Sequence, residues 1–200
     1  MTIVEIGTRG TEELTQRQRW SHYFVFIYAA LAVFIGFQLR SATLDATVLY
    51  TNSQVGIRAL YPQRWLIDTS DDYVFRVRDL TQIGFKTTMQ VDVQPVTINT
   101  SARNLLDTLT LNRMQTLSRY SVISNQPYIL PDEQEATAMR YVYVEGSDNP
   151  FLETVPTVVA GLDILTIRRG QAIIITFLSD SQTFDENLPI FERFLDELEF

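Results

Sequence analysis

One long apolar stretch near the start of the chain constrains its fold more than any other feature. Residues 21–39 read SHYFVFIYAALAVFIGFQL, nineteen residues without a formally charged side chain. A helix of that length extends roughly 28 Å at 1.5 Å per residue, close to the hydrocarbon thickness of about 30 Å in a bilayer. Apolar side chains would cover every face of this helix. We therefore predict a single transmembrane helix over residues 21–39.

The residues within and beside this stretch are typical of a membrane anchor. Trp20 and Tyr23 lie at one boundary, where amphipathic aromatic rings prefer the membrane–water interface. Ala29, Ala32 and Gly36 follow i, i+3, i+7 spacing and form a stripe of small side chains. Such a stripe lets a second helix approach closely, although small residues are also common in membrane spans generally.

Two other interpretations of the stretch are a cleaved signal peptide and a buried core helix. A signal peptide has an apolar region of about 7–15 residues; this one is longer, follows twenty other residues, and precedes only poor matches to a cleavage site at residues 41–46. A core helix normally keeps one polar face. A retained single span fits the pattern better than either.

The basic residues that flank the span predict its orientation. Arg9, Arg17 and Arg19 precede it, whereas Arg40 and Arg58 follow within about twenty residues, a small positive-inside excess. Residues 41–200 carry 12 basic and 21 acidic side chains, a net charge of −9. We predict a cytoplasmic tail at residues 1–20, the span at 21–39, and a domain at 40–200 on the periplasmic side of the inner membrane.

The composition excludes several kinds of chemistry. The chain has no cysteine and one histidine, His22, which excludes disulfides, thiolate metal sites, a catalytic thiol and covalent haem attachment through CxxCH. The net charge of −8 argues against nucleic acid as a partner. No nucleophile-elbow motif or glycine-rich phosphate loop occurs, and the acidic pairs at 71–72, 132–135 and 185–186 lack calcium-loop spacing. We expect no catalytic residue, metal or cofactor.

The domain at residues 40–200 reads as α+β. A helix is predicted from its N-cap Ser101 to about Tyr120, and a closing amphipathic helix from Leu188, with Pro189 in its first turn. Gly170 lies in the turn of a late hairpin, and the run at residues 173–175 predicts a central strand. We expect a mostly antiparallel sheet of about six strands with two helices packed on it. Alternation and β-branched runs predict strands at 48–50, 56–61, 65–67, 73–78, 84–96, 122–123, 139–144, 157–167 and 172–177.

The order of these elements resembles a known family. The run from Gly56 to Trp65 reads GIRALYPQRW, and a mid-domain helix, a late apolar hairpin and a phenylalanine-rich terminal helix follow it. Over about residues 50–200 the chain is similar to the PsbP/Mog1-like α/β/α sandwich. That resemblance implies a non-enzymatic binding or assembly module, because its members include extrinsic subunits and assembly factors of photosynthetic complexes and small secreted or lipid-anchored bacterial proteins. The domain lacks the histidines of photosystem members, and the chain lacks the cysteine of the lipoproteins.

Four residues of the domain are candidate contacts for a partner. Tyr61 and Trp65 belong to an aromatic cluster in the sequence. Core packing and β-propensity explain most residues of such a cluster, and a minority could form an exposed patch for a partner. Arg168 and Arg169 stand at the predicted hairpin tip, where they would reach an acidic partner or anionic lipid, or simply keep the hairpin soluble.

Two functions from different classes follow. The first is a non-catalytic accessory subunit that stabilises or positions redox subunits of a larger membrane complex. Its architecture resembles the small single-span subunits of respiratory or photosynthetic electron-transfer assemblies, such as alternative complex III. The second is a free-standing membrane-anchored periplasmic binding or assembly-factor protein. That second protein would take a small molecule or hydrophobic ligand between its sheet and helix. The first function predicts integral-membrane and extrinsic protein subunits of a larger complex as partners, and both functions predict the lipid bilayer.

Overall fold

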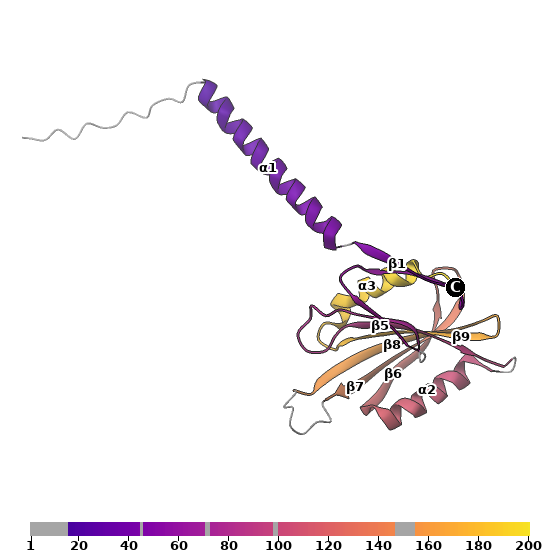
Figure 1. Cartoon of the computed structure of the whole chain (residues 1–200). Coiled ribbons are helices and arrows are strands. Elements are labelled where there is room, and N and C mark those ends of the chain that lie inside the picture. Colours follow the sequence, from indigo (N-terminus) through magenta and orange to yellow (C-terminus); the bar gives the residue numbers. More distant parts are fainter. Residues whose placement is uncertain (1–15, 45, 71–72, 98–99, 147–154) are drawn as a thin grey trace, which may run out of the picture. The chain divides into compact units, whose positions relative to one another are not determined.

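A computed structural model describes residues 16–44, 46–70, 73–97, 100–146 and 155–200. The chain divides between Ala46 and Thr47 into two compact units. The first contains helix α1 (Gln16–Leu44), and the second contains every strand and the helices α2 and α3 (Figure 1). The predicted tail at residues 1–20 lies mostly outside the described residues, as do the acidic pair at 71–72 and most of the predicted loop at 146–150.

Helix α1 is longer than the predicted span of residues 21–39. Its segment Trp20–Thr43 is long and apolar enough to cross a membrane, and none of that segment is buried within the chain. The helix continues past Arg40 to Leu44, and the Thr43 hydroxyl in its last turn donates a hydrogen bond to the Leu39 carbonyl at 3.0 Å. The apolar side chains of this segment have no cover within the described chain, and the helix could anchor the protein in a membrane.

The second unit is built on a seven-stranded antiparallel sheet in the order β3-β4-β5-β9-β8-β7-β6. A separate hairpin pairs β1 with β2 in antiparallel register. The predicted α+β class with a mostly antiparallel sheet is confirmed, with seven strands in the main sheet. The strands are β1 (Thr47–Asn52), β2 (Ile57–Pro62), β3 (Leu66–Ser70), β4 (Tyr73–Arg78), β5 (Thr88–Pro95), β6 (Ser118–Ile129), β7 (Glu135–Glu145), β8 (Thr157–Arg168) and β9 (Gln171–Asp180).

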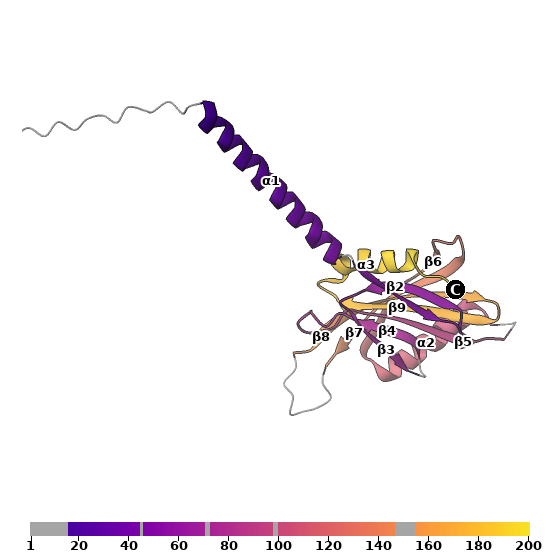
Figure 2. The same ribbon diagram turned by 45° about the horizontal axis from the view of Figure 1, so that its top comes forward.

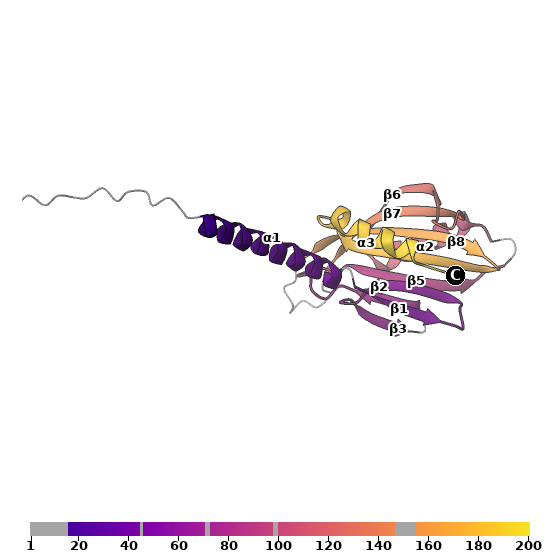
Figure 3. The ribbon, with the colours of Figure 1, turned by 90° about the horizontal axis from the view of Figure 1, so that it is seen from above.

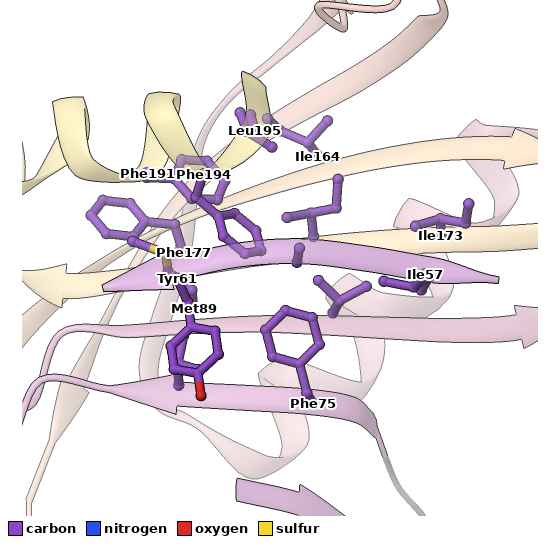
Figure 4. Close-up of a cluster of buried hydrophobic side chains, with 14 of the residues drawn as sticks. Ile57, Tyr61, Phe75, Met89, Ile164, Ile173, Phe177, Phe191, Phe194 and Leu195 are labelled. Atoms are coloured by element: carbon purple, nitrogen blue, oxygen red, sulfur yellow. The ribbon is translucent and has the colours of Figure 1, made fainter. Parts of the chain in front are cut away.

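One face of the sheet is covered by α3 (Phe184–Asp196) together with the β1–β2 hairpin (Figure 3). Phe191 stacks on Phe177 of the central strand β9, with ring centroids 4.9 Å apart, and Phe194 meets Phe75 of β4 edge to face. Ile57 of β2 is fully buried in the same cluster (Figure 4). This larger core joins the hairpin, the sheet and the closing helix.

The opposite face carries α2 (Ala102–Thr116), so the two helices lie on opposite sides of the sheet (Figures 1 and 2). The Ser101 side chain accepts a hydrogen bond from the Asn104 amide, as expected of an N-cap. Leu106 packs on Tyr141 and Leu165 in a second core cluster. Gly161 of β8 lets the Tyr141 ring lie across it, because an added Cβ would come within 2.3 Å of that ring.

Several element boundaries differ from prediction. Helix α2 ends at Thr116 instead of near Tyr120, because Leu117 is extended and leads directly into β6. Helix α3 begins at Phe184, which places Pro189 inside the helix and not in its first turn. The proline is tolerated because it is exposed, so water can satisfy the backbone carbonyl that loses its partner. Strand β6 is far longer than the predicted residues 122–123.

Candidate ligand-binding pocket beside helix α2

Helix α2 covers only half of its face of the sheet. It contacts β6, β7 and β8, and the same face of β4 and β5 is left without a helix. A pocket of about 600 Å³ opens there, within the size range of small-molecule sites. It is lined by Arg76, Arg78, Gly84, Phe85, Lys86, Thr88, Gln90, Tyr143, Glu145, Gly146, Val155, Thr157 and Leu178.

The strand register places the polar side chains of this face in a row. Arg76 of β4 pairs with Gln90 of β5, Gln90 pairs with Thr176 of β9, and Thr176 pairs with Asp163 of β8. Because side chains alternate between the faces of a strand, residues paired in this way share one face. Four strands therefore contribute one polar row, which runs from the pocket to the foot of α2.

Three cationic side chains line the pocket. The Arg76 Nε donates a hydrogen bond to the Gln90 Oε1 at 2.7 Å, and its guanidinium lies 4.2 Å from the Tyr73 ring centroid. The Lys86 ammonium donates to the Gln82 carbonyl. Neither Arg76 nor Lys86 forms an ion pair with any residue that the structure describes.

Arg78, the third cation, is only partly satisfied. Its Nη2 lies 3.1 Å from the Asp68 Oδ2, whereas its Nε is buried and has no hydrogen-bond partner among the described residues. A hydrogen bond from Tyr73 and the charge of Arg78 lower the pKa of Asp68 against its desolvation, so that carboxylate stays ionised. An unpartnered buried N–H costs about 1–3 kcal/mol.

Asp92 of β5 lies next to the pocket residues and shares this polar surface. Its Oδ2 accepts a hydrogen bond from the Gln90 amide at 2.8 Å, and its Oδ1 is buried without a partner in the described chain. Burial raises the pKa of Asp92 to about 6, and the nearby charge of Asp163 acts in the same direction. The carboxyl group therefore titrates close to neutral pH.

At the other end of the row, a buried ion pair attaches α2 to the sheet. Arg113 binds both oxygens of the Asp163 carboxylate, which also accepts hydrogen bonds from Thr176 at 2.8 Å and Tyr141 at 3.3 Å. Burial acts to lower the pKa of Arg113, but the adjacent Asp163 carboxylate outweighs it and raises that pKa. With its carboxylate oxygens bonded, Asp163 holds α2 in place and is not available to a ligand.

Comparison with known proteins identifies the fold. No protein-family model matches the sequence, and no curated protein matches it. The solution structure of cyanobacterial PsbP (CyanoP) from Synechocystis matches with a TM-score of 0.57 at 15% identity, covering 77% of this chain and 92% of that one. The second unit has a PsbP-like fold. The resemblance inferred from the GIRALYPQRW run and the order of elements is therefore confirmed at the level of fold.

A second solved structure is similar over a comparable length. A Pseudomonas aeruginosa protein of unknown function matches with a TM-score of 0.42 at 11% identity, covering 75% of this chain and 94% of that one.

The PsbP-like domain buries two of the four predicted partner contacts. Tyr61 is 8% exposed and Trp65 is 7% exposed, and both belong to the core under the hairpin. The prediction that they form an exposed partner patch is wrong, because the β1–β2 hairpin folds onto the sheet and turns these rings inward. Their role is to pack the domain.

Arg168 and Arg169 lie at the β8–β9 turn, as predicted. Arg168 donates to the Phe200 carbonyl at 2.5 Å and lies 3.5 Å from the Asp132 carboxylate, so it ties the last residue to the hairpin. Arg169 is exposed and has a positive φ of 50°. Of the four predicted contacts, Arg169 alone is an exposed cation without an ion pair to a residue that the structure describes, and its contact with a partner stays a prediction.

The anchor residues lie along α1. Trp20 and Tyr23 contact each other edge to face, with centroids 6.5 Å apart. Nothing within the described chain lies within 4 Å of a Cβ added at Gly36, and Ala29 and Ala32 are exposed. The stripe of small residues is therefore open to a second helix, and its packing there stays a prediction. His22 lies on the same helix, also exposed.

Sequence reasoning missed the pocket and the ion pair beside it. One signal for the pair was available: Asp163 is a single charge within the apolar run of residues 157–167, and a buried carboxylate needs a partner. The pocket left a weaker signal in the alternating polar positions of β4. Among the described residues, no group of three or more histidine, aspartate or glutamate side chains is placed to hold a metal.

Proposed function

We propose that the protein is a non-catalytic, single-span accessory subunit of a larger membrane complex, and that this complex is a respiratory or photosynthetic electron-transfer assembly similar to alternative complex III. In this proposal α1 packs among the helices of other subunits. The PsbP-like domain, on the periplasmic side of the inner membrane, stabilises or positions the redox subunits.

The observation that carries the proposal is the combination of an unpacked apolar helix with a PsbP-like domain. Every large apolar side chain from Trp20 to Leu39 is about half exposed or more. The segment therefore needs a bilayer or other helices to cover it. The small-residue stripe supports packing against helices. The fold supports an accessory role, because the family resemblance implies binding and assembly instead of catalysis.

A second candidate function is a free-standing membrane-anchored binding or assembly-factor protein. The pocket of about 600 Å³ beside α2 favours it, because an accessory subunit that acts only by packing has no need of a ligand site. The two functions differ in whether the protein stays bound to other subunits after mild solubilisation.

The proposal is tested by isolating the tagged full-length protein from its native membranes in mild detergent, followed by native electrophoresis and mass spectrometry. We expect it to migrate in an assembly much larger than its own 23.0 kDa, together with integral-membrane redox subunits. Migration alone at the monomer position would contradict the subunit proposal and favour the free-standing protein.

The matched control changes only the anchor. Ala30→Arg places a charge at mid-span, which costs about 2.5–3.5 kcal/mol on the insertion scale, so we expect most of this variant to be lost from the membrane fraction. The wild-type protein should resist alkaline carbonate extraction. Recovery of the intact wild-type chain in the carbonate supernatant would overturn both functions, because both depend on the span.

A further inference from the structure

The pocket beside α2 concentrates positive charge in an otherwise acidic domain. Residues 41–200 carry a net charge of −9, yet the charged residues that line the pocket are Arg76, Arg78 and Lys86 against one carboxylate, the exposed Glu145. The acidic remainder of the domain repels an anion elsewhere on its surface. An anionic ligand that approaches this domain is therefore favoured at this position.

The cations of the pocket have hydrogen-bonding capacity to spare. The Nε of Arg76 donates to Gln90, and neither of its two Nη groups forms a hydrogen bond or ion pair with a residue that the structure describes. Arg78 donates from Nη2 to Asp68, and its side chain is still 38% exposed. Arginine donates in a planar fork that matches the oxygens of a carboxylate or phosphate, so these two side chains suit such a head group.

The remaining wall of the pocket is apolar. Phe85 and Leu178 pack against the second core cluster, Tyr143 is buried in that cluster, and Val155 is largely exposed at the edge. Cations on one side and apolar surface on the other match a ligand with a charged head and an apolar body.

We infer that this pocket binds an amphipathic organic anion, whose carboxylate or phosphate head pairs with Arg76, Arg78 and Lys86 and whose apolar part packs on Phe85, Tyr143 and Leu178. The inference depends on the pocket alone and holds for either proposed function. Its test measures binding to the isolated protein, so its failure leaves the question of complex membership untouched.

The probe is phenyl phosphate, which joins a phosphate head to an apolar ring. It is titrated calorimetrically into the full-length protein in micelles of a non-ionic detergent, with micelles alone as the blank. We expect saturable binding that weakens as the salt concentration rises. Phenol, which lacks the head, and inorganic phosphate, which lacks the body, should each bind at least tenfold more weakly.

Arg76→Gln and Lys86→Gln should each raise the dissociation constant of phenyl phosphate at least tenfold. Arg64→Gln is the matched control, since Arg64 is exposed in the turn after β2 and does not line the pocket; its dissociation constant should equal that of the wild type. The two pocket variants are independent, so a folding defect in one leaves the other decisive. The inference is overturned if the wild type shows no binding above the blank, or if both pocket variants bind phenyl phosphate as tightly as the wild type.

The head group could belong to a soluble molecule or to an anionic lipid. The same titration is repeated in nanodiscs of phosphatidylcholine with and without phosphatidylglycerol. Weaker apparent binding of phenyl phosphate in the phosphatidylglycerol discs identifies a lipid head group as a competing occupant, and equal binding identifies a soluble anion. Both results support an anion site.

Discussion

Asp163 of β8 and Arg113 of α2 form a buried ion pair. The Asp163 side chain is completely buried, so its charge is stable there only because Arg113, Thr176 and Tyr141 all donate to it. The Arg113 guanidinium also lies 4.4 Å from the Tyr141 ring centroid. One carboxylate thus joins β7, β8, β9 and α2.

Replacement of Arg113 by alanine should destabilise the domain strongly, because it leaves the Asp163 carboxylate buried and unpaired. Breaking a buried pair in this way costs about 3–5 kcal/mol. The measurement is urea unfolding of the full-length protein in detergent micelles, followed by the fluorescence of the buried Trp65 in a Trp20→Phe background.

Two variants act as controls for this prediction. Arg103→Ala removes an exposed arginine from the same helix and should change the unfolding free energy by less than about 0.5 kcal/mol. The double variant Arg113→Met/Asp163→Leu removes both charges and should cost less than Arg113→Ala alone. If Arg113→Ala unfolds like the wild type, Asp163 is not the buried anion described above.

The β1–β2 hairpin and helix α1 place their apolar side chains in opposite environments. The hairpin turns Ile57, Ala59 and Tyr61 into the domain core. Helix α1 turns its apolar residues outward on all sides and meets no core within the described chain. Its apolar side chains therefore need cover from outside the described chain, which a bilayer or other helices would supply.

If the small-residue stripe contacts another helix, enlarging it should disrupt that contact. Gly36→Leu keeps the span apolar and meets no steric conflict within the chain, so membrane insertion should be unchanged. We expect the fraction of the protein that co-migrates with partner subunits on a native gel to fall severalfold.

Ala30→Leu is the control for the stripe, since position 30 lies about 100° around the helix from Ala29. It places a leucine of the same size outside the stripe and should leave co-migration unchanged. Equal behaviour of Gly36→Leu and Ala30→Leu would remove the stripe from the partner interface.

At the scale of the whole molecule, the pH dependence of the unfolding free energy depends on which acidic side chains are buried. Most of the 24 acidic side chains can lie at the surface, where water solvates their charge. Asp92 is different, because burial raises its pKa from 3.8 to about 6. The folded domain therefore holds a proton on Asp92 at pH values where the unfolded chain has released it.

Asp92 should make the domain less stable as the pH rises from about 4 to about 6. The raised pKa contributes stability that is complete below the unfolded value of 3.8 and is lost as the pH passes the folded value of about 6. We expect the unfolding free energy of the wild type to fall by about 1–2 kcal/mol relative to Asp92→Asn over this interval, after allowance for solvent screening.

The measurement is the urea unfolding described above, repeated from pH 4 to pH 7. Asp107→Asn, which changes an exposed carboxylate on α2, should follow the wild-type curve at every pH. A constant difference between the wild type and Asp92→Asn across the interval would show that Asp92 is not buried as described.

Much of the fold could be predicted because its signals are local. Strand β4 covers the predicted residues 73–78, Ser101 caps α2, and Gly170 has the positive φ of 77° that a tight hairpin turn needs. The apolar run at 173–175 lies in β9, the middle strand of the sheet. Each of these follows from neighbouring residues and their periodicity.

Other features could not be predicted, for identifiable physical reasons. Strand β6 is an edge strand with mostly exposed side chains and two register shifts, so it lacks the alternation that reveals a strand. The burial of Tyr61 and Trp65 depends on where the hairpin folds. The predicted start of α3 at Leu188 lies C-terminal to its observed start at Phe184, because proline is common in the first turn of a helix and the sequence pattern assigns Pro189 to that turn.

The sequence by itself determined the apolar anchor, the α+β class and most strands of the PsbP-like domain, because periodicity and turn residues act over a few positions. Only the tertiary structure decided which strands are neighbours. By placing β5 beside β9, it brings Arg76 and Gln90 into one row with Thr176 and Asp163 and leaves the pocket open beside α2. Pairings between distant segments depend on the packing of the whole core, so no local pattern records them.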